Sequence, residues 1–206
     1  MKTIPLYLIR LGLLAGVCLL ATAPSAAQKD PKQTAANTIA IKLAEPVRLQ
    51  TLSKPVKFYI GSVVDRSGNP QPILVLRPRG GIYLDREPKA IVQEAMEQSL
   101  TAGGALASDQ ESADFILSIY VFHFGLGEGS GMEFYGKVEL TVLVKNPKTG
   151  KSVEVPGFGT SIQGTAVRKK NILANVKENL ETALSESLRN FLRGTKLRDT
   201  VKELGE

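Results

Sequence analysis

Residues 134–144 alternate largely between apolar and polar side chains, and this pattern constrains the fold more than any other feature of the chain. One face collects the apolar members: Phe134, Val138, Leu140, Val142 and Val144. The other face collects Tyr135, Lys137, Glu139 and Thr141. Successive side chains of a strand point to opposite sides, so one face packs on a core and the other faces water. The segment therefore predicts a strand with one wet face.

Three other segments predict strands beside it. Residues 56–65 (VKFYIGSVVD) are rich in β-forming residues and end at a Ser-Gly-Asn-Pro turn. Residues 113–124 (ADFILSIYVFHF) are apolar on both faces, which favours a central strand. Residues 151–163 follow a turn at 146–150 and predict a further neighbouring strand.

Two segments have helical periodicity. The first follows Asp85, which we expect to cap it, tolerates Pro88 in its first turn and ends at Gly103. The second ends at Gly194, before a short last helix, and carries the stripe Ile172, Leu173, Val176, Leu180, Leu184, Leu188 and Leu192. The order β-α-β-β-β-α predicts an α+β two-layer sandwich, in which two amphipathic helices cover one face of a mainly antiparallel sheet of about four strands.

The N-terminus is typical of a secretory signal. Lys2 and Arg10 precede an uncharged run of 13 residues, 11–23, which is too short to span a bilayer. Small residues at Ser25 and Ala27 predict cleavage after Ala27. We therefore expect a signal peptide at 1–27, a flexible segment with a possible edge strand at 28–55, and a single α+β domain at 56–206.

Lipid anchoring at Cys18 is disfavoured, because Val17 is too bulky for the position before an acylated cysteine. Removing residues 1–27 takes away Lys2 and Arg10 and no acid, so the formal net charge falls from +6 to +4. This mild charge does not suggest nucleic-acid binding and allows at most peripheral contact with a membrane. The expected location is the periplasm.

The chain has one cysteine and one histidine, Cys18 and His123. These counts exclude a disulfide framework within the chain, a Cys₂His₂ or Cys₄ zinc site and a two-histidine metal site. We expect no catalytic residues, no metal and no cofactor.

One cluster of charged residues predicts a binding surface. Asp65 and Arg66 end the first predicted strand, and Arg77, Arg79 and Arg86 follow in the loop after it. Guanidinium groups pair well with carboxylate or phosphate. The loop also carries the apolar run 73–76 and several prolines, which limit the entropy lost on docking. The alternative is a structural Asp–Arg pair.

Other candidates favour structural roles. The glycine-rich run 125–131 lacks phosphate-loop spacing and predicts a hairpin loop. His123 has no partner nearby in sequence, and the acids Asp109, Glu111 and Asp114 lack the order of a calcium loop. The basic run 168–170 precedes the long helix, where cations oppose the helix dipole, so an anionic partner is an alternative to a solvated loop.

The segments Val63–Arg66, ADFILSIYVFHF and VELTVLVKNPKTGK, followed by a long terminal helix, resemble the YajG-like envelope lipoproteins. The same order of elements is similar to the N-terminal domain of TolB and to penicillin-binding-protein activators. The resemblance covers about residues 56–206 and implies a location in the cell envelope, with no known reaction. The chain departs from the lipoprotein pattern at Val17 and Cys18.

Three functions follow as hypotheses. The first is a non-catalytic envelope protein that binds another envelope component. The second is an auxiliary carrier of a lipid-like ligand, which needs an apolar cavity between helices and sheet. The third is a cell-wall or lipid hydrolase, which needs converging carboxylates from Asp65, Glu128, Glu133 or Glu139.

Cleavage after Ala27 predicts a mature protein that begins at Gln28. N-terminal sequencing of the protein recovered from the envelope fraction checks this. An N-terminus at a lipid-modified Cys18 would contradict it.

Overall fold

The computed structural model describes residues 37–52, 54–68, 72–76, 80–129, 133–161, 165–166 and 171–205. All of these described residues belong to one compact unit. The expected signal peptide lies outside the described residues. None of the described helices is both long enough and apolar enough to cross a bilayer.

The larger sheet has the strand order β2 (Phe58–Asp65), β5 (Phe115–Glu128), β6 (Glu133–Lys145) and β7 (Ser152–Thr160). β2 runs parallel to β5, and the other pairs are antiparallel. The short β8 (Thr165–Ala166) pairs with the first residues of β6. The strand that is apolar on both faces, β5, is a central strand, as its sequence predicts.

A smaller sheet joins β1 (Thr38–Ile39), β4 (Gly80–Leu84) and β3 (Leu74–Leu76) in that order. β3 and β4 form an antiparallel hairpin, and β1 runs parallel to β4. Ile73 and Leu74 pack against the core, whereas the Val75 side chain is 59% exposed. The apolar run after β2 is therefore divided between core and surface.

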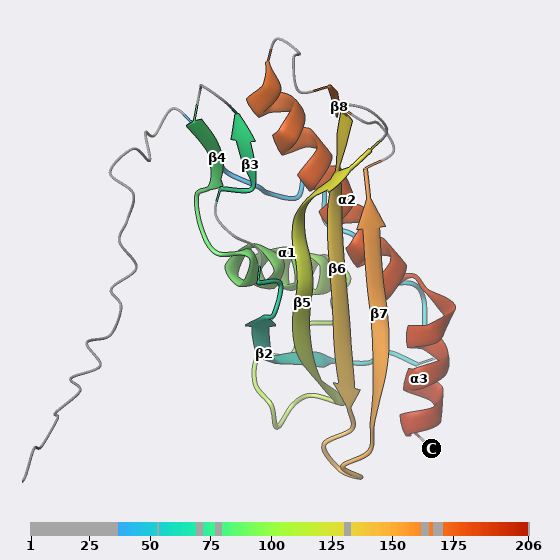
Figure 1. Ribbon diagram of the computed structural model, residues 1–206. Helices are drawn as coiled ribbons and strands as arrows, with labels where there is room; N and C mark the ends of the chain where they lie inside the picture. The colour runs from blue at the N-terminus through green and yellow to red at the C-terminus, as the bar shows by residue number, and fades with distance from the viewer. Residues whose placement is uncertain are drawn as a thin grey trace, which may run out of the picture. The chain divides into compact units, whose positions relative to one another are not determined.

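Helices α1 (Pro88–Ala102) and α2 (Ile172–Leu192) lie on one face of the larger sheet, behind the strands in Figure 1. The short α3 (Thr195–Gly205) follows α2. The predicted two-layer α+β sandwich is confirmed. The stripe of α2 also has the predicted phase, since Leu180 and Leu184 are fully buried and Glu178 is exposed.

Three local predictions differ from the structure. α1 begins at Pro88 with Glu87 as N-cap, so Asp85 is not the cap. Gly125 to Glu128 belong to β5 rather than to a hairpin loop. Residues 37–52, expected in a flexible segment with a possible edge strand, do form the edge strand β1, but they also place Ile39, Ile41 and Val47 in the hydrophobic core. The packed domain therefore includes chain that precedes Val56.

Glycines allow α2 to lie directly on β6 and β7. A Cβ built on Gly136 would lie 2.1 Å from the Asn179 carbonyl oxygen, and one on Gly159 would lie 2.0 Å from that of Ala183. Both distances are far below van der Waals contact. Any side chain at these positions would push the helix off the sheet.

Gly159→Ala is therefore expected to reduce the free energy of unfolding by about 1–3 kcal/mol, because the added methyl group overpacks the interface between the layers. Gly205→Ala is the control, since a Cβ there meets nothing within 4 Å, and its effect should stay within about 0.5 kcal/mol. Urea unfolding of both variants measures the difference. Equal midpoints would show that the helix can shift at no cost.

Candidate functional site

Three of the charged residues that the sequence groups into one binding surface are described, and each has a different partner. Asp65 ends β2, and its Oδ1 accepts a hydrogen bond from the Ser67 amide at 2.8 Å, which closes the turn after the strand. The Arg66 guanidinium carbon lies 4.3 Å from the centre of the Tyr120 ring. Such a stacked cation is attracted by the face of the aromatic ring. Arg66 therefore belongs to the sheet surface.

Arg86 has a structural role. Its guanidinium forms an ion pair with Glu94 of α1 and donates a hydrogen bond to the Ile41 carbonyl oxygen at 3.4 Å. It thereby joins the chain before residue 44 to the first helix. Arg77 and Arg79 lie outside the described residues. Within the described residues, Asp65 forms no ion pair with an arginine.

None of the described helices or strands covers the face of the larger sheet opposite α1 and α2. The strand register sets its side chains in rows that cross the sheet. One row holds Val64, Tyr120, Thr141 and Pro156. The next row towards the end of β5 holds His123, Glu139 and Phe158. Towards the start of β5, one row contains Ser118 and Leu143, and the row after it contains Tyr59 and Ile116. We call this surface the open face.

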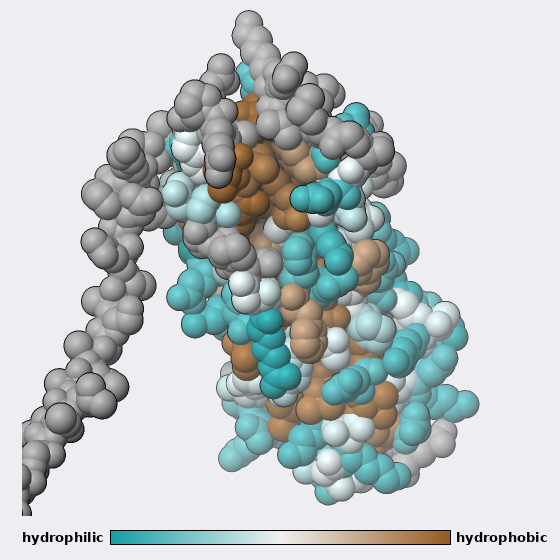
Figure 2. Space-filling view, in the orientation of Figure 1, coloured by the Kyte–Doolittle hydropathy of each residue, from teal (hydrophilic) through white to brown (hydrophobic). Residues whose placement is uncertain are grey.

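The open face exposes large apolar side chains. Val64, Phe122 and Phe158 are 39%, 44% and 47% exposed, and they come from three different strands. Figure 2, which looks onto this face, shows apolar patches between polar ones. Lys137 and Glu139 form an ion pair at 2.9 Å, so the centre of the face carries little net charge. Exposed aromatics, a stacked arginine and few free charges are typical of the core of a protein–protein interface.

The edges of the sheet are less suited to binding than its face. Pro156 in β7 has no amide hydrogen, and the carbonyl oxygen of Phe158 accepts a hydrogen bond from Asn190 Nδ2 at 2.5 Å. The opposite edge strand, β2, has a register shift between Ile60 and Ser62. Proline and bulges are devices that prevent another strand from joining an edge.

His123 lies at a register shift in β5 that also exposes Phe122. Its Nε2 atom is buried and has no hydrogen-bond partner among the described residues. Burial lowers the pKa of the imidazole, Lys137 lowers it further, and Glu139 opposes both. The ring therefore favours the neutral form at physiological pH.

The carboxylates proposed for a hydrolase do not all converge. Asp65 pairs in register with Val121, and Glu128 lies seven residues further along β5, about 23 Å away at 3.3 Å per residue. Paired glycosidase carboxylates lie within about 10 Å of each other. Asp109 and Asp114 accept hydrogen bonds from the amides of Ser112 and Lys57, so they stabilise the approach to β5. In the described part of the chain, no cluster of three potential metal ligands occurs.

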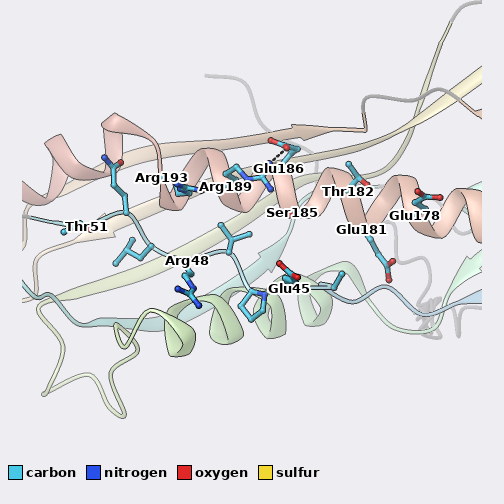
Figure 3. A pocket seen from close by; sticks show the side chains of 15 residues that line it. Glu45, Arg48, Thr51, Glu178, Glu181, Thr182, Ser185, Glu186, Arg189 and Arg193 are labelled. Atoms are coloured by element: carbon cyan, nitrogen blue, oxygen red, sulfur yellow. Dashed lines mark hydrogen bonds and ion pairs between the residues drawn. The ribbon is translucent and has the colours of Figure 1, made fainter.

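A second surface lies on the helix side of the domain. A groove of about 990 Å³ runs between residues 44–51 and α2 (Figure 3). Residues 42–50 are held by three amides: Lys42 donates to Glu181 Oε1, Val47 to Ser99 Oγ and Gln50 to the Leu192 carbonyl oxygen, each at 3.1 Å. This segment therefore spans from α1 to α2 and forms one wall of the groove.

Sequence reasoning missed most of both surfaces. The alternation of 134–144 identified the wet face of one strand, and the open face extends it across four strands. Phe122 and Phe158 carry no sequence signal of exposure, because an apolar residue in a strand predicts burial. One wall of the groove is formed by residues 44–51, in which apolar and polar residues show no regular alternation.

The described domain is thus a two-layer α+β domain with one open sheet face. No family model matches the chain, and no curated protein matches its sequence. Among solved structures it is similar to protein XCC0632 from Xanthomonas campestris, of the family DUF330. The TM-score is 0.58 at 12% identity, over 81% of this chain and 98% of that one. At this identity the likeness establishes a shared fold and says nothing of activity.

Two further likenesses are weaker. The hypothetical protein CT253 from Chlamydia trachomatis has a TM-score of 0.44 at 10% identity, over 74% of this chain and 100% of that one. A PelC dodecamer from Paraburkholderia phytofirmans has a TM-score of 0.40 at 14% identity, over 69% and 93%. Neither score establishes a shared fold. The resemblance to YajG-like proteins stays a prediction.

The lowered pKa of His123 predicts a pH-dependent stability. The unfolded chain binds the proton near pH 6.5, more readily than the folded one. The stabilisation is therefore complete above about pH 6.5 and declines as the pH falls through that value towards the folded pKa. His123→Gln should reduce the dependence of the free energy of unfolding on pH between about pH 7 and pH 5. Lys137→Gln should reduce this dependence in part. An unchanged slope in His123→Gln would contradict this.

Proposed function

We propose that this chain is an exported, non-catalytic protein of the cell envelope that binds another envelope component through the open face. The observation that carries the proposal is the exposure of Val64, Phe122 and Phe158 on three strands of one uncovered sheet face. A partner that covers this face removes apolar surface from water, at about 25 cal/mol for each Å² buried.

Export is supported by the N-terminal sequence, with its 13-residue apolar run and small residues before Gln28. The non-catalytic role is supported by the sites that were tested as candidates. His123 is paired in register with Glu139, beside Lys137, and no serine or threonine lies directly opposite it in the ladder. Asp65 closes a turn, Asp109 closes another before β5, and Asp114 accepts a hydrogen bond from the Lys57 amide beside β2.

A lipid-like ligand is less well supported. Where Gly136 and Gly159 meet α2, the sheet and helix backbones are in direct contact and leave no room for a ligand. Leu117, Ile119, Leu180 and Leu184 fill the adjacent interface and are fully buried. The proposal therefore places recognition on the outside of the sheet.

Photo-crosslinking in the intact envelope tests this function. A photoreactive amino acid is placed at Phe122, at Phe158 and, as a control, at Glu203, which is exposed on α3. We expect one adduct of discrete mass from both sheet positions and not from Glu203. The binding of the identified partner should then weaken at least about tenfold in Phe122→Asp/Phe158→Asp, because aromatic anchors dominate such interfaces.

Val75→Asp is the matched control for that variant, since it changes an exposed apolar residue outside the open face. Equal affinity of the two variants, at equal stability, would refute the choice of surface. Turnover of an envelope substrate by the purified protein would refute the non-catalytic role.

A further inference from the structure

The groove between residues 44–51 and α2 is acidic at one end and basic at the other (Figure 3). Glu45 lies across from the stretch of α2 around Ser185, on the side of Arg48 that is nearer Glu181 and Glu178. Arg48 lies below Arg189 and Arg193, at the C-terminal end of α2. The charges on the two walls therefore follow the same order along the groove, from acidic to basic. Such a surface is complementary to a ligand that has opposite charges at its two ends.

Several of these charges have no partner in the described part of the chain. Glu186 forms an ion pair with Arg189, and Glu181 is engaged by Lys177 and by the Lys42 amide. By contrast, Glu45 and Glu178 at the acidic end form no ion pair or side-chain hydrogen bond with a described residue. The same is true of Arg48 and Arg193 at the basic end.

The backbone that lines the groove is also largely unpaired within the described residues. Of residues 44–51, the amides of Val47 and Gln50 donate hydrogen bonds, and no carbonyl of the segment accepts one. Gln50 Oε1 is buried without a hydrogen-bond donor among the described residues. Unpaired main-chain groups of this kind can hydrogen-bond to a peptide laid beside them, as the free edge of a sheet does, and such bonds supply affinity.

The separation of the charges limits the ligand. The midpoint of Glu178 and Glu181 is about 17 Å along α2 from the midpoint of Arg189 and Arg193, at 1.5 Å per residue. An extended peptide covers that distance in about five residues, at 3.3 Å each. A compact small molecule cannot reach both ends.

We propose that this groove binds an extended peptide segment of a partner protein. The segment carries a basic residue at the acidic end and an acidic residue about five positions away at the basic end. This site lies on the helix layer, opposite the open face, and does not depend on the function proposed for that face.

Fluorescence anisotropy with a defined peptide tests the proposal on the exported chain. The probe is an eight-residue, end-capped, fluorescein-labelled peptide of threonine and valine, with lysine at its second position and glutamate at its seventh. The reversed order of the two charges is the second probe, and saturable binding of either order supports the proposal. Replacing both charged residues of the peptide by threonine should weaken binding at least about tenfold.

Charge reversal in the protein separates recognition from general attraction. Arg48→Glu/Arg193→Glu should weaken binding of the original peptide at least about tenfold, and a peptide with lysine in place of its glutamate should restore it. Lys151→Glu/Lys196→Glu makes the same change in net charge at exposed positions outside the groove and should leave the affinity within about twofold.

Backbone pairing has its own test. Methylating alternate amide nitrogens of the bound peptide should weaken binding about tenfold, because it removes main-chain donors. The proposal is overturned by an absence of saturable binding up to about 1 mM peptide, by equal affinity for the uncharged peptide, or by equal effects of the two charge-reversed variants. Phe122→Asp/Phe158→Asp should bind the peptide normally, so failure at one surface is distinguishable from failure at the other.

Discussion

The contact between the backbone of α2 and the backbones of β6 and β7 is the interaction on which the rest of the structure depends. Gly136, Gly157 and Gly159 face the helix, and a Cβ at each would lie within 2.8 Å of a helix carbonyl oxygen. The helix is therefore seated at fixed positions along both strands. Because one layer cannot slide over the other, the groove beside α2 and the strand register beneath it are held by the same contact.

That contact also explains why the two faces of the sheet differ. The inner face alternates glycine with large apolar residues, so that the helix approaches closely and the remaining space is filled. The outer face has no second layer among the described residues, and cross-strand pairs cover it only in part. The ring of Tyr135, for example, lies over Gly127, where a Cβ would be 2.6 Å from the ring. Recognition and stability thus use opposite sides of the same strands.

Residues 37–52 connect the parts of the domain that lie far apart in sequence. β1 pairs with β4, the Ile41 carbonyl oxygen accepts a hydrogen bond from Arg86, and the amides of Val47 and Gln50 bind α1 and α2. With Ile39, Ile41 and Val47 in the core, this segment completes the helix layer. One side of this segment packs against the core, and the other side lines the groove.

The sequence by itself determined the order of the four long strands of the larger sheet and of the helices, the central place of β5 and the phase of α2, because each depends on a local periodicity of apolar residues. The burial of Ile39 and Val47 and the exposure of Phe122 and Phe158 were decided by the tertiary structure. Burial of an irregular segment depends on which distant elements lie beside it, and exposure of an apolar strand residue depends on whether another layer covers it. The different roles of Arg86 and Arg66 have the same cause, because their partners, Glu94 and Tyr120, come from elements far apart in sequence.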